Sequence, residues 1–185
     1  RRHAEYFSRW LEEHKRLLQT EPNEAYQRIA ADMDNCLKAW DWALAHERLD
    51  LLSQAVHTLS TFDQVAGLYS KGLARLRLAV EKVRLLVGEA PASLLMERRV
   101  ALGRLLLELS FYLERARSNS EAYAVAREAH GLGEATRDAF VTSGAALRLG
   151  SIFFSRSDCR EAERWSRLGL ELAREHGLSQ LELLA

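Results

Sequence analysis

The sequence predicts an all-α fold, and three observations favour that class. The 185 residues include only two prolines and ten glycines, so few positions break a helix. Leu, Ala, Arg and Glu dominate the composition, and all four are strong or acceptable helix formers. No stretch alternates apolar and polar side chains between turn signals, as a half-buried strand would.

Eight helices and the start of a ninth follow from proline, glycine and the apolar periodicity. Pro22 and Pro91 suit the opening of a helix, where a missing N–H costs least. Gly67, Gly88 and Gly177 fit helix ends. The predicted helices cover residues 1–20, 23–47, 49–66, 70–87, 91–117, 120–131, 134–156 and 158–176, and residues 179–185 begin another. Because the connections are short, consecutive helices should pack as antiparallel hairpins.

Composition limits the classes of function. The chain has 26 basic and 26 acidic residues, a formal net charge of +0, which argues against a nucleic-acid or anionic-membrane binder. Cys36 and Cys159 have no ligand spacing and indicate a reduced, cytoplasmic protein. No apolar run approaches the about 18 residues of a membrane span. Because the sequence opens without Met, we expect a part of a longer protein.

A recurring set of small residues links three helix pairs. The second set follows the first by 50 residues (109 − 59), and the third follows the second by 40 (149 − 109). Small residues on both helices of a pair let the two backbones approach, as stacked hairpins require. The sets are Leu59-Ser60, Gly72 and Ala79; Leu109-Ser110, Ala122 and Ala129; and Leu149-Gly150, Ala162 and Gly169.

This arrangement resembles the tetratricopeptide (TPR) repeat. The last unit has Leu149-Gly150, Phe153 and Ala162 at TPR spacings, although Ala146 and Ser166 replace the usual aromatics. The resemblance implies a right-handed α-solenoid of antiparallel helix hairpins, with degenerate, elongated repeats at about 49–88, 91–132 and 134–177. The alternative is that the repetition arises from helical composition alone.

The first half carries a second resemblance. In order, it contains His3-Ala4, Tyr6-Phe7, Asp34-Asn35, Trp42-Ala43-Leu44 and Ala66-Gly67-Leu68-Tyr69-Ser70-Lys71-Gly72. This order is similar to the helical region after the nucleotide-binding core of bacterial STAND-type signal-transduction ATPases, which include large LuxR-type and SARP-type transcription regulators. Lys71 and Cys36 depart from the usual acidic residue and leucine.

That resemblance implies different roles for the two parts of the chain. Residues 1–48 would form an N-terminal helical hairpin linked to an ATPase core of the same parent chain, and residues 49–185 would form TPR-like repeats that sense a protein, a peptide or a small inducer. It does not imply an ATPase in these residues, because they contain no G-x-x-x-x-G-K-[ST] loop. The Gly131-Leu132-Gly133 stretch is too short for a dinucleotide fingerprint and is better interpreted as a helix C-cap and linker.

The stretch at residues 32–50, DMDNCLKAWDWALAHERLD, begins like a calcium-binding loop but lacks the later residues that such a loop needs. Asp32, Asp34 and Asn35 match its first ligands, but Leu37 and Ala43 stand where a calcium loop needs glycine and glutamate. If both aspartates lie within one helix, their side chains point about 200° apart.

The same stretch also falls short of a zinc motif. His46-Glu47 is followed by Asp50 in place of the second histidine of H-E-x-x-H, and a helix junction falls there. We therefore expect no metal and no cofactor. The other histidines and the serines form no catalytic constellation, so we expect no enzyme, although a site built from widely separated residues is an alternative.

The remaining residues of this stretch indicate a packed helix. Trp40 and Trp42 place large aromatic side chains on two faces, as in a helix that is covered on both sides. Asn35 would order a helix junction by bonding a backbone group, or else contact the ATPase core. His46 would be favoured near a helix C-terminus by the helix dipole.

The first helix of each repeat would line a binding groove. Three arginines beside two phenylalanines would suit an acidic or aromatic peptide, because arginine grips carboxylates with two prongs and aromatics serve as anchors. The alternative is that the phenylalanines are core residues and the arginines ordinary surface. The groove would contain His57, Thr61, Gln64, Arg104, Glu108, Phe111, Arg115, Arg148, Ser151 and Phe154.

The sequence thus predicts a non-catalytic sensor scaffold of a bacterial regulator. Its expected partners are a protein, a peptide or an inducer, and neither nucleic acid nor membrane is expected. The alternatives are a free-standing TPR adaptor or self-association module, and an uncharacterised helical enzyme.

Overall fold

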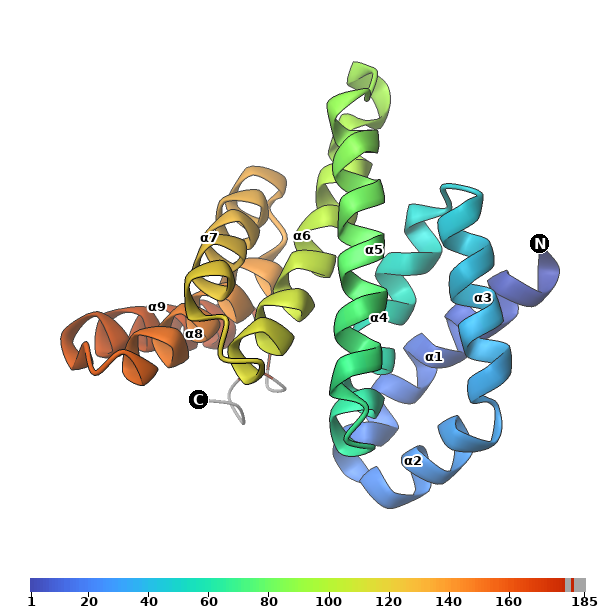
Figure 1. Ribbon diagram of the computed structural model, residues 1–185, viewed down its shortest axis with the longest axis horizontal. Coiled ribbons are helices and arrows are strands. Elements are labelled where there is room, and N and C mark those ends of the chain that lie inside the picture. Colours follow the sequence, from blue (N-terminus) through green and yellow to red (C-terminus); the bar gives the residue numbers. More distant parts are fainter. Residues whose placement is uncertain (179–180, 182–185) are drawn as a thin grey trace. The chain divides into compact units, whose positions relative to one another are not determined.

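The computed structural model describes residues 1–178 and 181, apart from the side chain of Gln19. The described residues are all-helical and contain no strand, which confirms the predicted fold class (Figure 1). The helices are α1 (Arg2–Thr20), α2 (Pro22–Ala31), α3 (Met33–Ala45), α4 (Leu49–Val65), α5 (Tyr69–Gly88), α6 (Ala92–Arg115), α7 (Asn119–Thr136), α8 (Ala139–Ser155) and α9 (Cys159–Glu175).

Most predicted helices are present, but two predictions were wrong. The predicted helix at 23–47 is two helices, because the chain turns at Asp32 between α2 and α3. The Gly131-Leu132-Gly133 stretch is not a C-cap and linker, because α7 continues through it to Thr136 and is capped by Arg137. The helix predicted at 179–185 lies outside the described residues except at Leu181.

The chain divides into two compact units, Arg1–Arg75 and Leu76–Ala185. In the first unit, α1 packs against α2, α3 and α4. Its core includes the fully buried side chains of Leu11, Ile29, Cys36 and Leu52. The hydroxyl of Thr58 on α4 donates to the Leu11 carbonyl at 3.0 Å, so α4 is also fixed to the backbone of α1.

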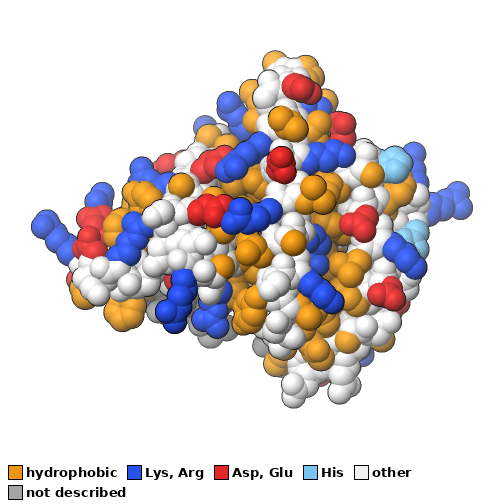
Figure 2. All heavy atoms as spheres, in the orientation of Figure 1, with side chains coloured by type: hydrophobic (Ala, Val, Ile, Leu, Met, Phe, Trp, Pro, Cys, Tyr) orange, Lys and Arg blue, Asp and Glu red, His pale blue; other side chains and the backbone are white. Residues whose placement is uncertain are grey.

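In the second unit, consecutive helices from α6 to α9 pack against one another (Figure 1). The helices α6 and α8 also touch. Arg104 pairs with Asp138 and Glu114 with Arg148, in both cases 34 residues apart, and this constant spacing shows that the two helices run in the same direction. Arg77 and Arg84 of α5 pair with Glu121 and Glu128 of α7 in a constant 44-residue offset. Figure 2 shows acidic and basic side chains alternating where these helices lie side by side.

One turn geometry recurs between the helices. After α3, α4, α6, α7, α8 and α9, a backbone N–H bonds to the carbonyl five residues earlier, and the residue before that N–H has a positive φ of 56–70°. This is the Schellman C-cap, in which the left-handed residue satisfies the last carbonyls of the helix. The left-handed residues are Glu47, Gly67, Arg117, Arg137, Ser157 and Gly177.

The turns repeat at the intervals predicted from the small residues. Gly67, Arg117 and Ser157 lie 50 and 40 residues apart (117 − 67 and 157 − 117). The small residues of the predicted sets are buried, as at Ser60, Ser110 and Ala122 with 1%, 0% and 0% exposure.

The far end of the α5–α6 hairpin carries no core. No described residue from 84 to 100 is buried, and Leu85, Leu94 and Met96 are exposed by 64%, 41% and 53%. The core of this hairpin begins at Val83 on α5 and at Ala101 on α6.

Candidate functional site

The residues predicted to line a groove divide between the two units. His57, Thr61 and Gln64 lie half-buried on α4 in the first unit. The Thr61 hydroxyl donates to the His57 carbonyl at 2.9 Å, which satisfies it within the helix.

In the second unit, the predicted residues of α6 and α8 meet around a carboxylate that the sequence had not singled out. Glu114 accepts a hydrogen bond from Arg148 Nη1 at 3.2 Å and another from the Ser151 hydroxyl. The Arg148 guanidinium carbon lies 4.8 Å from the centre of the Phe111 ring, and Arg115 lies 5.9 Å from the same ring. The side chains of Arg148 and Glu114 are 24% and 15% exposed, so this pair is largely withdrawn from solvent.

A second contact joins the same helices nearer the start of α8. Arg104 Nε donates to Asp138 at 2.9 Å, and the other oxygen of Asp138 accepts from the Val141 N–H and caps α8. Glu108 is buried on α6 with 6% exposure. Two of the three predicted ligand-binding arginines, Arg104 and Arg148, are therefore engaged within the protein and hold α6 to α8.

Phe154 differs from these residues, because it is exposed by 71%. It is thus not a core residue, whereas Phe111 is half-buried beneath Arg148. Phe154 lines a groove of about 480 Å³ between α8 and α9, which we call the α8–α9 groove. Its lining residues are Leu147, Gly150, Ser151, Phe154, Cys159, Ala162, Glu163 and Ser166.

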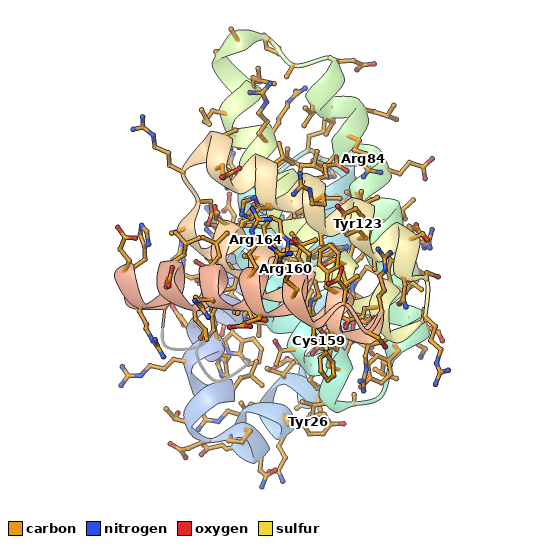
Figure 3. All side chains as sticks on the ribbon, turned by 90° about the vertical axis from the view of Figure 1, so that its left-hand side faces the viewer. Tyr26, Arg84, Tyr123, Cys159, Arg160 and Arg164 are labelled. Atoms are coloured by element: carbon orange, nitrogen blue, oxygen red, sulfur yellow. The ribbon has the colours of Figure 1, made fainter. Side chains whose placement is uncertain are left out.

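A second depression, of about 470 Å³, lies on α9 and has a more charged lining. Beneath it, Trp165 is 8% exposed, with the guanidinium groups of Arg127 and Arg164 5.5 and 5.9 Å from its ring centre. Figure 3 shows Arg160 and Arg164 extending from one side of α9, with Tyr123 of α7 beyond them. Glu163 and Glu171 also line the depression, so its charge is mixed.

The 32–50 stretch builds a helix junction. The Asn35 amide donates to Asp32 at 3.0 Å, so it orders the α2–α3 turn through a side chain and not through the backbone group that we predicted. Trp40 is 2% exposed, whereas Trp42 is half-buried and stacks on His46 at 4.2 Å. His46 caps α3 and its Nδ1 hydrogen-bonds the Trp42 carbonyl at 2.9 Å.

The two cysteines differ in burial. Burial, with a smaller contribution from Asp32, raises the pKa of the Cys36 thiol to about 12, which keeps it protonated and unreactive. Cys159 is exposed. The described residues contain no group of three or more His, Cys, Asp or Glu placed to hold a metal ion. Among the same residues, no helix is long and apolar enough to cross a membrane.

Sequence reasoning missed Glu114, Asp138 and Trp165. The first two carried a signal, since each is the acidic partner of an arginine at the same 34-residue spacing. Trp165 carried none, because a single tryptophan on an amphipathic helix does not reveal an arginine that approaches it from another helix, here Arg127 of α7.

In comparisons with protein families, curated proteins and solved structures, none matches this chain. The class that the described residues define is therefore structural: an all-α protein whose second unit consists of successively packed helices.

Proposed function

We propose that this chain is a non-catalytic binding scaffold, built as a right-handed solenoid of degenerate TPR-like hairpins. It would form the sensor part of a bacterial transcription regulator and bind a protein, a peptide or an inducer. The alternative is a free-standing adaptor or self-association module of the same architecture.

The observation that carries this proposal is the repeated packing of the second unit. The 40-residue interval in the small residues returns in the turns, and α6 and α8 lie side by side with a constant register. Arrays of this kind keep their stability in contacts between neighbouring repeats and leave extended faces free for partners.

The chemistry of the α6–α8 face supports binding over catalysis. Its arginines are neutralised by Glu114 and Asp138, and those pairs join helices. A catalytic acid or base would instead stand at a pocket with a proton to exchange. At Phe154, an exposed aromatic side chain of the predicted groove and a hollow occur together.

Binding can be tested with the purified chain. We expect a fluorescently labelled chain to be retained by a subset of an array of helical and extended peptides, with affinities on the order of micromolar, as is common for small surface grooves. If a chain shown by circular dichroism to be helical is retained by none of them, the scaffold proposal is wrong.

The regulator context has a separate test. The reading frame upstream of Arg1 in the parent gene should encode a phosphate-binding G-x-x-x-x-G-K-[ST] loop. A start codon close to Arg1 would instead favour the free-standing adaptor.

A further inference from the structure

Opposite charges line the surface where side chains of α5 and α7 meet, which we call the α5–α7 seam. The paired side chains are 39–48% exposed, and they are Arg77 and Arg84 of α5 with Glu121 and Glu128 of α7. The seam keeps this exposure although the next hairpin, α8 and α9, packs onto α7 through α8. A further hairpin in such an array therefore leaves the preceding seam open to solvent.

The α7–α9 seam, where side chains of α7 and α9 meet around Trp165, carries arginines that are not neutralised in this way. Within the described part of the chain, Arg127 and Arg160 pair with no carboxylate, and both are exposed. Arg164 reaches Glu161 only at 3.4 Å, and its side chain is 72% exposed. The seam is therefore rich in available positive charge.

These three arginines lie close together on the seam. Arg127 of α7 and Arg164 of α9 stand 5.5 and 5.9 Å from the centre of the same ring, that of Trp165. Arg160 precedes Arg164 by one turn of α9, so the two side chains lie on the same face of the helix. Figure 3 shows both extending from one side of α9, with Tyr123 of α7 beyond them.

The nearby acidic side chains do not neutralise this group. Glu128 is bonded to α5, and Glu163 is paired with Arg167 one turn along α9. Glu171 lies two turns after Arg164, at the far end of the depression on α9. Carboxylates from outside the described residues can therefore approach the three arginines.

The repeat shows how α9 differs from α7. Subtracting 40 residues places Arg160, Arg164 and Leu168 of α9 at the positions of three residues of α7. The replaced residues are Ser120, Ala124 and Glu128. Compared with α7, α9 thus gains two cations and loses one of the carboxylates that neutralise the α5–α7 seam.

We propose that the α7–α9 seam binds an acidic segment of a partner protein, with carboxylates placed against Arg127, Arg160 and Arg164. The proposal rests on the scaffold function above and names the chemistry of the partner. Charge complementarity favours this occupant, because guanidinium groups bind carboxylates through two parallel N–H donors.

Nucleic acid fits the seam less well than an acidic peptide does. Bases bound without a duplex stack on accessible aromatic faces, whereas Trp165 is only 8% exposed beneath its arginines. The carboxylates of Glu163 and Glu171 also stand on α9, where they would repel a continuous phosphate backbone. The separated carboxylates of a peptide can avoid them.

The seam can be tested with two peptides that differ only in charge. The first is a fluorescently labelled peptide of alternating Glu and Ser, about twelve residues long, which in extended form spans the length of α9. The second has Gln in place of every Glu. Binding to the full chain is measured by fluorescence anisotropy at low salt, where ion pairs at a surface are least screened.

We expect the Glu peptide to bind and the Gln peptide not to bind. The double variant Arg160→Gln with Arg164→Gln should weaken binding about tenfold, because two exposed ion pairs are lost. Replacing the same two arginines by lysine, which keeps the charge, should retain most of the affinity. Circular dichroism should show equal helicity in all variants.

The α5–α7 seam supplies the matched control. Arg77→Gln with Arg84→Gln removes the same charge from arginines that already have carboxylate partners, so binding should stay within about twofold of the wild type. Equal weakening by the two double glutamine variants would show that the peptide responds to net charge alone, and the seam assignment would be wrong.

Two further outcomes would overturn the proposal. One is a single-stranded oligonucleotide of equal charge that binds more tightly than the Glu peptide through Arg160 and Arg164, which would make nucleic acid the occupant. The other is failure of the Glu peptide to bind. If array peptides still bind in that case, the scaffold function stands and this site is wrong; if neither binds, both proposals fail.

Discussion

His130 is a buried ionisable residue whose surroundings oppose its charge. It is 9% exposed on α7, its ring lies edge-on to Trp165 at 5.2 Å, and its Nε2 is buried without a hydrogen-bond partner among the described residues. Burial lowers the pKa of its imidazole, and nearby Arg127 lowers it further, while Glu134 at 3.4 Å partly opposes both. The folded protein therefore favours the neutral ring.

This lowered pKa predicts a loss of stability in mild acid. Below the ordinary histidine value of about 6.5, the unfolded chain takes up a proton that the folded chain resists, so the free energy of unfolding falls as pH falls. In urea titrations between about pH 7.5 and pH 5, His130→Phe should show a smaller fall than the wild type. His176→Phe, at an exposed helix end, is the matched control, and an undiminished fall in His130→Phe would contradict the assignment.

At the scale of the elements, glycines have two distinct roles. A Cβ at Gly150 on α8 would stand 2.2 Å from the Ser166 hydroxyl oxygen and 3.1 Å from the Ser166 backbone nitrogen. At Gly131 on α7, nothing lies within 4 Å of such a Cβ. Gly150 therefore sets the approach of α8 to α9, whereas Gly131 only weakens its helix.

The two glycines predict opposite effects of alanine. Gly150→Ala should lower the free energy of unfolding by about 1–3 kcal/mol, because the contact includes backbone that cannot rotate away. Gly131→Ala should raise it by about 0.5–1 kcal/mol through helix propensity. Chemical denaturation of both variants measures the difference, and equal effects would contradict the packing described here.

Other glycines explain which helix ends could be predicted from the sequence. Gly67 and Gly177 correctly marked helix ends, because both adopt positive φ. Gly133 led to a wrong prediction of a helix end. It lies inside α7, where the lack of a side chain makes room for Thr142, because a Cβ at Gly133 would stand 2.5 Å from the Thr142 hydroxyl oxygen. The break at Asp32 was missed because no proline or glycine marks it.

Some members of the candidate site were predictable, but their roles were not. The spacing placed Phe111, Arg148 and Ser151 on one face, and the structure brings them together. Arg148 and Ser151 of α8 pair inward with Glu114 of α6, and helix periodicity alone cannot supply the register between α6 and α8.

On the scale of the whole molecule, the two units carry separate stabilising features. In the first, the carboxylate of Asp63 on α4 pairs with Arg75, their side chains being 2% and 14% exposed, and Arg75 also lies 5.9 Å from the ring centre of Trp40. In the second, the close approach at Gly150 joins the last helices. Each feature has its partners within its own unit.

A substitution should therefore loosen one unit at a time. Asp63→Asn should destabilise by about 3 kcal/mol, because it leaves a largely buried guanidinium without its counter-ion. Hydrogen exchange should rise in residues 1–75 and stay unchanged in residues 101–175, and Gly150→Ala should show the reverse. Glu128→Gln, in an exposed pair, should change little. Equal acceleration in both units would show that the chain opens as a single cooperative body.

The coreless end of the α5–α6 hairpin has a practical consequence. Nothing buried depends on residues 84–100, and the turn at Glu89 and Ala90 lies outside both helices. Exposed backbone without core contacts is where proteins accept an inserted peptide or new chain ends. The hairpin end is thus the natural position for an inserted affinity tag or fluorescent reporter that leaves the α8–α9 groove untouched.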